Sequence, residues 1–263
     1  MKQRLLLFIT TLMLCMVARA ENTTEQVFNG LRYIIHTDEN YAELISYDYW
    51  LDNTQSEVVI PASITWEGKA YPVTELGNRC FSSCYYLTSV TIPSSVTSLG
   101  YGCFYSCDGL TSITIPSSVT SLGRSCFEGC YKLTSIIIPS SVTSLGDYCF
   151  SGCRSLTSVN ILASAKSLPS CCFSECKSLK SINISSFVTS IGELCFYGCR
   201  SLEAVNIPSS VTSLGNKCFA ECNNLKSINM PSSLMSLGKG CFYNCIYNHR
   251  TTKTNQKYPS VNL

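Results

Sequence analysis

A single motif, Cys-Phe-x-x-Cys, returns eight times in this chain at a constant interval of 23 residues. No insertion or deletion separates any two copies, whose first cysteines are Cys80, Cys103, Cys126, Cys149, Cys172, Cys195, Cys218 and Cys241. Chance does not produce such regularity. A period of roughly 20 to 29 residues is typical of leucine-rich-repeat solenoids. The sequence therefore predicts one elongated repeat array over residues 80–245.

Within each unit the sequence predicts a strand followed by a turn. In the copy that begins at Leu87, β-branched residues alternate with small polar ones over 89–92, the period of a half-buried strand. Pro93 is expected to end the pairing because proline has no N–H to donate. Gly100 is expected to permit a tight bend before the last segment, since glycine tolerates backbone angles that other residues avoid.

The last segment of the unit, which carries the two cysteines, is expected to form a short helix. On a helical turn Cys103, Phe104 and Cys107 would lie on one face and point into the coil. Stacked coils would then bury columns of leucine and phenylalanine, because no coil can bury its apolar face alone. The predicted fold class is an α/β solenoid of 23-residue leucine-rich repeats (strand, turn, short helix) with a β-rich N-terminal cap.

The copy that begins at Leu156 departs from the pattern. Leu162 replaces the proline, Pro169 replaces the glycine, and Cys171 adds a further thiol. We expect the array to bend or bulge at this copy. Drift in a tolerant turn explains the change better than a functional gap.

Three further segments complete the predicted organisation. Residues 1–20 combine a positive start, an apolar stretch and a small-residue cleavage site, which predicts a secretory signal peptide. Residues 21–79 are expected to form a β-rich N-terminal cap and an irregular first repeat that shield the first coil. Residues 246–263 form a polar C-terminal tail. The predicted location is secreted or at the extracellular cell surface.

Charge and hydropathy exclude several classes of partner. The formal net charge is +2, and loss of Lys2, Arg4 and Arg19 with the signal peptide lowers it to −1. Charged residues make up 14% of the chain and form no basic stripe along the sequence. We therefore expect no nucleic-acid partner. No apolar stretch reaches the length of a comfortable membrane span, so none is expected.

The repeat resembles the BspA-like leucine-rich repeats of bacterial surface proteins. The resemblance rests on the leucines, the Ile-Pro-Ser-Ser turn, the Leu-Gly bend and the Phe-x-x-Cys ending, over about residues 57 to 245. The first cysteine of each pair departs from the family's usual alanine, but both residues are small and readily buried. The resemblance implies a secreted or cell-surface adhesin that contacts host matrix proteins or other cells.

The cysteines are the first candidates for chemistry. A pair at i and i+4 could bind a metal, and secreted chains rich in cysteine often form disulfides. The pairs nevertheless recur on the expected inward face of every coil beside a phenylalanine. This regularity favours buried free thiols over disulfides, and more strongly over a metal site. No metal or other cofactor is expected.

Catalytic groups are scarce in the sequence. The two histidines, His36 and His249, lie outside the array, so the repeats cannot assemble a Ser-His-Asp or Cys-His site. Acidic residues are scattered singly at variable positions of the repeat. No catalytic residue is assigned, and the chain is not expected to be an enzyme.

The outward positions of the predicted strands form the candidate binding surface. The candidate partner-binding residues on it are Thr91, Thr114, Asn160, Asn183, Asn206 and Asn229. A solvated strand face with stacked amides is the alternative interpretation. A second candidate lies on the side of the predicted helix, where Tyr101, Tyr105, Tyr148, Tyr197 and Tyr243 are expected to be exposed.

These features predict a binding or adhesion protein whose partner is a macromolecule, such as a host matrix protein or another cell. An extracellular glycan-binding protein that uses the serine, threonine and asparagine face is the first alternative. A secreted enzyme with its site in residues 21–79 is the second. The family resemblance supports the fold more strongly than the partner, because one repeat architecture serves many ligands.

Overall fold

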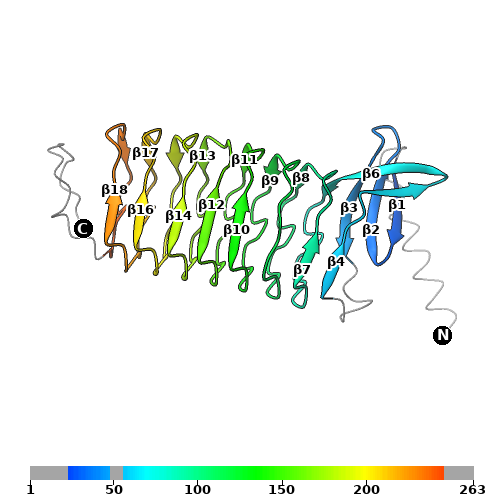
Figure 1. Ribbon diagram of the computed structural model, residues 1–263, viewed down its shortest axis with the longest axis horizontal. Helices are drawn as coiled ribbons and strands as arrows, with labels where there is room; N and C mark the ends of the chain where they lie inside the picture. Colours follow the sequence, from blue (N-terminus) through cyan, green and yellow to red (C-terminus); the bar gives the residue numbers. More distant parts are fainter. Residues whose placement is uncertain (1–22, 48–55, 246–263) are drawn as a thin grey trace.

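The computed structural model describes residues 23–47 and 56–245, which form an elongated β-solenoid of about seven coils behind a cap of strands (Figure 1). The coils stack side by side along the long axis, as the repeat predicts. The predicted signal peptide and C-terminal tail lie outside the described residues. No helix among the described residues is long and apolar enough to span a membrane.

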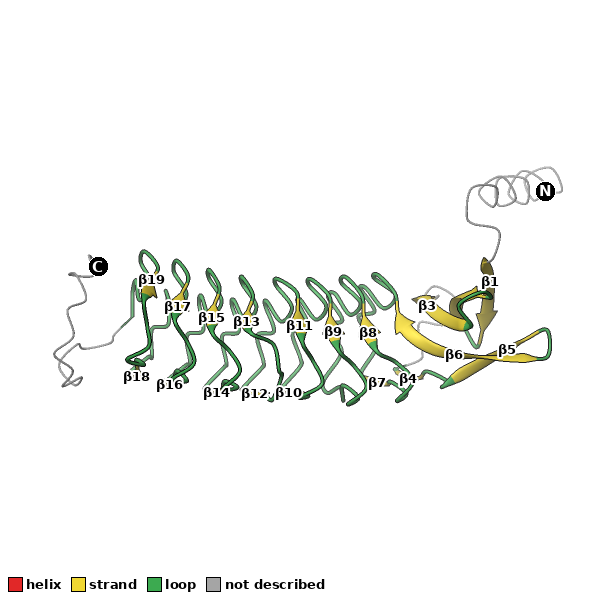
Figure 2. Ribbon diagram, turned by 90° about the horizontal axis from the view of Figure 1, so that it is seen from above, coloured by secondary structure: helices red, strands yellow, loops and turns green. Residues whose placement is uncertain are grey.

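The predicted α/β class is wrong, because no helix occurs within the described ranges and the cysteine segments are turns (Figure 2). The hydrogen bonds show why. Phe104 N–H donates to the Cys126 carbonyl of the next coil (2.8 Å), whereas Cys107 N–H donates to the Phe104 carbonyl three residues back (3.2 Å). An α-helix needs every N–H to reach four residues back within its own segment. Here alternate N–H groups join neighbouring coils instead.

Backbone angles also prevent a helix in these segments. The residue before each of the two cysteines has a positive φ in every coil, such as 56° at Gly102 and 53° at Ser106. A left-handed residue at every fourth position reverses the chain before a helical turn can continue. We call the side of the solenoid built from these Cys-Phe-x-x-Cys turns the turn side.

A second side, the strand side, carries short parallel strands in register from coil to coil. Its strands are β4 (Glu57–Val59), β7 (Ser89–Thr91), β10 (Ser135–Ile138), β12 (Ser158–Ile161), β14 (Ser181–Asn183), β16 (Ala204–Asn206) and β18 (Ser227–Asn229). Within each of them the central valine or isoleucine is buried and its neighbours face outward or lie half-buried. This alternation is the predicted period of two.

The third side, the serine side, consists of two-residue parallel strands that join β6 (Lys69–Leu76) of the cap. These strands are β8 (Ser98–Leu99), β9 (Ser121–Leu122), β11 (Ser144–Leu145), β13 (Ser167–Leu168), β15 (Ser190–Ile191), β17 (Ser213–Leu214) and β19 (Ser236–Leu237). Each places a serine outward and a leucine or isoleucine inward. The ladder runs from β6 to β11 and resumes from β13 to β19, with no pairing between β11 and β13 among the described strands.

The break in the serine side has a local cause in the irregular copy. In neighbouring coils the glycine after the strand donates its N–H to the preceding coil, as Gly146 does to Leu122 (2.9 Å) and Gly192 to Leu168 (2.8 Å). Pro169 occupies the equivalent position and has no N–H to donate. The irregularity predicted for this copy is thus an interruption of one ladder.

The cap is built from antiparallel strands that turn into the parallel array. β1 (Thr23–Phe28), β2 (Leu31–His36) and β3 (Tyr41–Tyr47) form a meander, and β3 pairs in parallel with β6. β5 (Ser63–Trp66) and β6 form a hairpin whose turn residues, Glu67 and Gly68, both have positive φ. This turn type matches the twist of two antiparallel strands.

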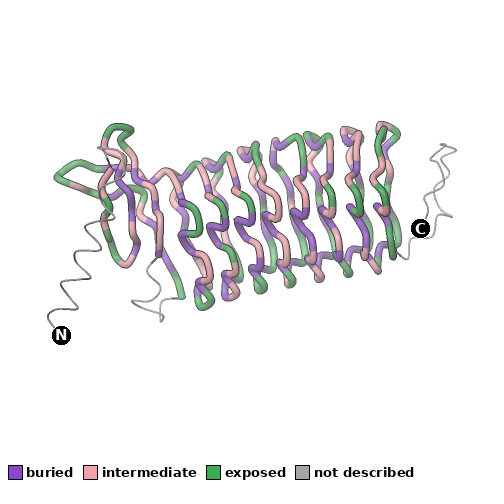
Figure 3. Tube along the Cα trace, turned by 180° about the vertical axis from the view of Figure 1, so that it is seen from behind, coloured by how far each residue is buried: buried purple, intermediate pink, exposed green. Residues whose placement is uncertain are grey.

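A column of phenylalanine rings runs through the core from Phe81 to Phe242. Adjacent rings are nearly parallel, with centroids 5.1 to 5.8 Å apart. Tyr47 of the cap lies against Phe81, with ring centroids 5.7 Å apart, and covers the first ring of the stack. Buried residues follow the inside of every coil (Figure 3). The core is therefore continuous from the cap to the last coil.

The glycines at the end of the serine-side strands allow close approach between coils. A Cβ added at Gly123 would lie 2.5 Å from the Gly100 carbonyl carbon of the preceding coil. Neither Gly100 nor Gly123 has a positive φ. The tight bend predicted for Gly100 is therefore not the reason for glycine there, because close approach of two backbones requires it.

Candidate binding surfaces

The strand side brings the six predicted partner-binding residues into one column. Thr91 lies in β7, Asn160 in β12, Asn183 in β14 and Asn206 in β16, with Asn229 following in β18. Thr114 occupies the equivalent position of a coil in which no strand is assigned. All are exposed except Asn160, which is half-buried, and exposed Ile137 separates the threonines from the asparagines. The folded chain thus collects residues 23 positions apart into a single row.

The asparagines bond to one another in pairs. Asn183 Nδ2 donates to Asn160 Oδ1 (2.9 Å), and Asn229 Nδ2 donates to Asn206 Oδ1 (3.0 Å). β14 and β16 are not paired in the described sheets, so the column consists of two amide pairs. Each pair keeps unused donor and acceptor capacity that points away from the core. The row can therefore offer both kinds of hydrogen-bonding group to a partner.

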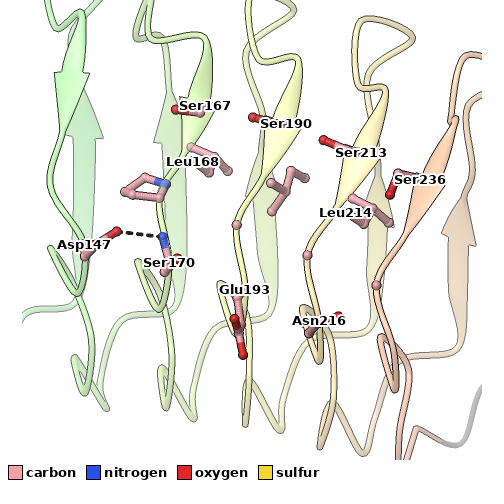
Figure 4. A pocket seen from close by; sticks show the side chains of 15 residues that line it. Asp147, Ser167, Leu168, Ser170, Ser190, Glu193, Ser213, Leu214, Asn216 and Ser236 are labelled. Carbon is pink, nitrogen blue, oxygen red and sulfur yellow. Dashed lines mark hydrogen bonds between the residues drawn. The ribbon is translucent and has the colours of Figure 1, made fainter.

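A shallow groove of about 590 Å³ lies along the serine side (Figure 4). The outward serines Ser167, Ser190, Ser213 and Ser236 line it at successive coils. Asp147, Glu193 and Asn216 form its other edge, and Asp147 Oδ1 accepts a hydrogen bond from Ser170 N–H (3.0 Å). A row of hydroxyl groups beside carboxylates suits a hydroxyl-rich ligand.

The turn side exposes only some of the predicted tyrosines. Tyr101, Tyr105 and Tyr243 are exposed, whereas Tyr148 and Tyr197 are half-buried. The Arg124 guanidinium lies 5.1 Å from the centre of the Tyr148 ring and covers it. Tyr85, Tyr86 and Tyr131 are also exposed on this side. The tyrosines are therefore spread over several columns and do not form one platform.

The cysteines are free thiols, as the sequence favours. All 17 in the described chain are unpaired, and 16 of them are buried. Burial raises the pKa of thiols such as Cys107, Cys130 and Cys153, which keeps them protonated and unreactive. No group of three or more metal-ligating side chains that could hold an ion occurs among the described residues.

The cap contains the one histidine of the described chain, within an acidic neighbourhood. His36 stacks on Tyr41 with ring centroids 4.3 Å apart, and its Nε2 lies 3.5 Å from Glu43 Oε2. Glu43 and Glu75 are register partners on β3 and β6. Burial and the neighbouring Glu43 raise the pKa of Glu75. If the chain were an enzyme with its site in the cap, Glu43 and Glu75 would be the first residues to substitute in a test of activity.

The family model for the BspA-type leucine-rich repeat region matches residues 74–202 and 145–260. The chain belongs to this family. The BspA-type assignment confirms the resemblance seen in the repeat motif, including the Phe-x-x-Cys ending. No curated protein matches the chain.

Solved structures with the same fold come from bacterial leucine-rich repeat proteins. A leucine-rich cell surface protein from Faecalibacterium prausnitzii is 27% identical, with a TM-score of 0.64 over 86% of this chain and 76% of that one. A leucine-rich repeat protein from T. pallidum is 26% identical, with a TM-score of 0.61 over 84% of this chain and 89% of that one. The chain therefore shares its leucine-rich repeat fold with these two proteins at 26 to 27% identity.

The serine groove is the feature that inspection of the sequence missed. Its serines sit beside an inward leucine in the Ser-Leu step of nearly every copy. That step lies after the predicted strand, and a serine repeated at one position of each unit is itself a signal of an outward column. The asparagine column was found because its strands are longer and alternate clearly.

Proposed function

We propose that this BspA-type chain is a secreted or cell-surface binding protein that presents its strand side to a macromolecular partner. The observation that carries the proposal is the single row of threonine and asparagine side chains with unused hydrogen-bonding groups, held on a rigid solenoid. The similarity to the F. prausnitzii cell surface protein supports an extracellular location. A host matrix protein or another cell is the proposed partner, and adhesion is the proposed role.

The stacked coils explain how such a surface could bind. Each asparagine contributes a hydrogen bond of about 0.5 to 1.5 kcal/mol, so affinity would come from many weak contacts along the row. Parallel register holds these contacts at fixed spacing, which lowers the entropy lost on binding. Binding of this kind needs no catalytic group.

Glycan binding is the second candidate, and the serine groove is the observation that favours it. Four serine hydroxyls and the carboxylates of Asp147 and Glu193 line one open groove. Sugars are recognised by such alternating donors and acceptors. A glycan array would show whether neutral sugars bind and whether Ser190→Ala and Ser213→Ala remove that binding.

The test of the main proposal combines Asn160→Lys, Asn183→Lys, Asn206→Lys and Asn229→Lys. Lysine adds bulk and charge at outward positions without removing an inward side chain, so the fold should persist. Binding to a panel of immobilised extracellular matrix proteins should fall at least about tenfold, which corresponds to roughly 1.4 kcal/mol.

The matched control places lysines at Tyr105, Tyr197 and Tyr243 on the turn side. This variant should bind as the unmodified chain does. Loss of binding in the control with retention in the asparagine variant would move the site to the turn side and refute the proposal.

A further inference from the structure

Stacking brings three basic residues together on one edge of the solenoid. The residue that follows the second cysteine of each coil forms a column, which we call the edge column. In three successive coils it is Arg154, Lys177 and Arg200. These residues are 23 positions apart, so they form no basic stripe along the sequence and come together only in the folded chain.

The hydrogen bonds fix these three residues in register. Ser178 N–H donates to the Arg154 carbonyl (3.2 Å), and Ser201 N–H donates to the Lys177 carbonyl (3.1 Å). The same coils are separated by 5.4 and 5.6 Å at their phenylalanine rings. The three residues therefore follow one another about one coil apart along this edge, where Arg154 and Arg200 are exposed and Lys177 is half-buried.

The charges on this edge are only partly compensated within the chain. Lys177 Nζ lies 3.2 Å from Glu175 Oε2. Arg154 lies against the Tyr131 ring, 4.8 Å from its centre, and has no ion pair among the described residues. Arg200 likewise has no carboxylate partner within the part of the chain that the structure describes. Positive charges about one coil apart repel one another, and a bound anion would relieve that repulsion.

We propose that the edge column from Arg154 to Arg200 binds a sulfated linear polysaccharide. A guanidinium forms paired hydrogen bonds with a planar or tetrahedral oxyanion, and two arginines flank the central lysine. One sugar of an extended chain is about as long as one coil is wide, so successive sulfates could meet successive cations. Ser155, Ser178 and Ser201 follow the three basic residues and add hydroxyl groups beside the column.

The surroundings favour a polysaccharide over other polyanions. Single-stranded nucleic acid is bound through aromatic faces on which bases stack, and the neighbouring Tyr131, although exposed, has one ring face against Arg154. An extended acidic peptide places its same-face side chains about 6.6 to 6.8 Å apart. This is wider than the 5.4 and 5.6 Å between these coils, so its carboxylates would drift out of register with the cations. The basic part of the edge column is also short, because the equivalent residues in the coils before and after it are the uncharged Tyr131 and Asn223.

This inference does not depend on the proposed function of the strand side, since the edge column contains none of the threonine and asparagine residues of that row. The asparagine variant described above should therefore bind sulfated polysaccharide normally. Each proposal can fail without the other.

The test measures the affinity of the full chain for heparin at low salt. The variant Arg154→Gln, Lys177→Gln, Arg200→Gln should lose at least about tenfold in affinity, and the salt dependence of binding should weaken. The matched control removes three exposed lysines elsewhere, Lys166→Gln, Lys217→Gln and Lys239→Gln, and should change affinity by less than about twofold. Asn223→Arg extends the column by one coil and should tighten binding.

Three outcomes would overturn the proposal. The first is equal loss in both triple variants, which would indicate diffuse attraction to the net charge. The second is tighter binding of an oligothymidine than of heparin with the same dependence on the edge column, which would indicate nucleic acid. The third is a chain that binds heparin no better than uncharged dextran. Circular dichroism of each variant verifies that the solenoid remains folded.

Discussion

At the scale of the residue, the two cysteines of the motif have different roles. From Cys107 onward, the second cysteine of each coil donates its S–H to a phenylalanine carbonyl, as Cys153 does to Phe127 (3.2 Å) and Cys176 to Phe150 (3.2 Å). Among the first cysteines, Cys80 and Cys103 contact each other instead, with their sulfur atoms 3.4 Å apart. The second position therefore needs a donor, whereas the first needs only a small side chain.

This difference predicts unequal effects of serine at the two positions. Cys149→Ser should lower the free energy of unfolding by about 1 to 3 kcal/mol, because it buries a hydroxyl among sulfur and carbon atoms. In the part of the chain that the structure describes, Cys149 Sγ has no carbonyl acceptor comparable to Phe127 O. Cys153→Ser keeps a donor beside that carbonyl and should cost less than Cys149→Ser.

Urea unfolding of the two variants gives the comparison directly, with Cys149→Ala as the control. Alanine removes the sulfur without adding a hydroxyl, so this control should be milder than Cys149→Ser. Equal losses for Cys149→Ser and Cys153→Ser would contradict separate roles for the two thiol columns.

At the scale of the element, the strands could be predicted from the sequence, whereas the turns of the cysteine segments could not. Alternation at 89–92 correctly indicated β7. Cys103, Phe104 and Cys107 do share the inward side, but a helix is not the only conformation that places them there. The left-handed positions give little warning, because residues such as Leu194 and Lys217 occupy them in some coils. Tertiary hydrogen bonding decides their backbone angles.

Two glycine substitutions separate the two reasons for glycine in this fold. Gly152 has a φ of 71°, and a Cβ there would meet nothing closer than 3.8 Å, so Gly152→Ala carries mainly a conformational cost of about 1 kcal/mol. Gly123→Ala would drive a Cβ to 2.5 Å from the Gly100 backbone and must push two coils apart. We expect the second variant to lose clearly more stability.

Thermal unfolding of both variants measures which of them loses more stability. Hydrogen exchange adds a local measurement, since Gly123→Ala should weaken protection of the serine-side amides in the adjacent coils. A smaller loss for Gly123→Ala than for Gly152→Ala would show that close approach is not the constraint at Gly123.

At the scale of the whole molecule, stacking in register determines which surfaces exist. The sequence identified the strand-side row because its residues recur at a fixed position and change from threonine to asparagine. It did not identify the edge column, since Arg154, Lys177 and Arg200 are isolated along the chain and occupy a position that varies between copies. A column of unlike residues becomes visible only when the coils are aligned in space.

The same stacking shows where the array is weakest. Between β11 and β13 the serine side loses its pairing at Pro169, whereas the strand side and the core continue across the junction. β10 pairs with β12, and the Phe150 and Phe173 rings remain 5.4 Å apart. Each coil is stabilised mainly by its nearest neighbours, so loss of one ladder lowers the local stability at this interface.

The last prediction is that trypsin makes its first cut within residues 56–245 after Lys166. Lys166 is exposed and directly precedes β13, in the coil whose serine side is unpaired on one edge. Local unfolding of the segment around Lys166 breaks fewer hydrogen bonds between coils than local unfolding of the same segment in the other coils. The segment should therefore reach a cleavable state more often. Mass spectrometry of the fragments over time identifies the first site.

The cut chain should remain one particle under native conditions, because the phenylalanine stack and the β10–β12 pairing cross the junction. Size-exclusion chromatography should show a single peak, and a denaturing gel should show two fragments. Pro169→Gly is the matched variant, since it supplies an N–H that can donate to the Leu145 carbonyl and join β13 to β11. Cleavage after Lys166 should be slower in this variant. Faster cleavage after Lys177 or Lys180, or an unchanged rate in Pro169→Gly, would show that the interrupted ladder does not set the weakest point of the solenoid.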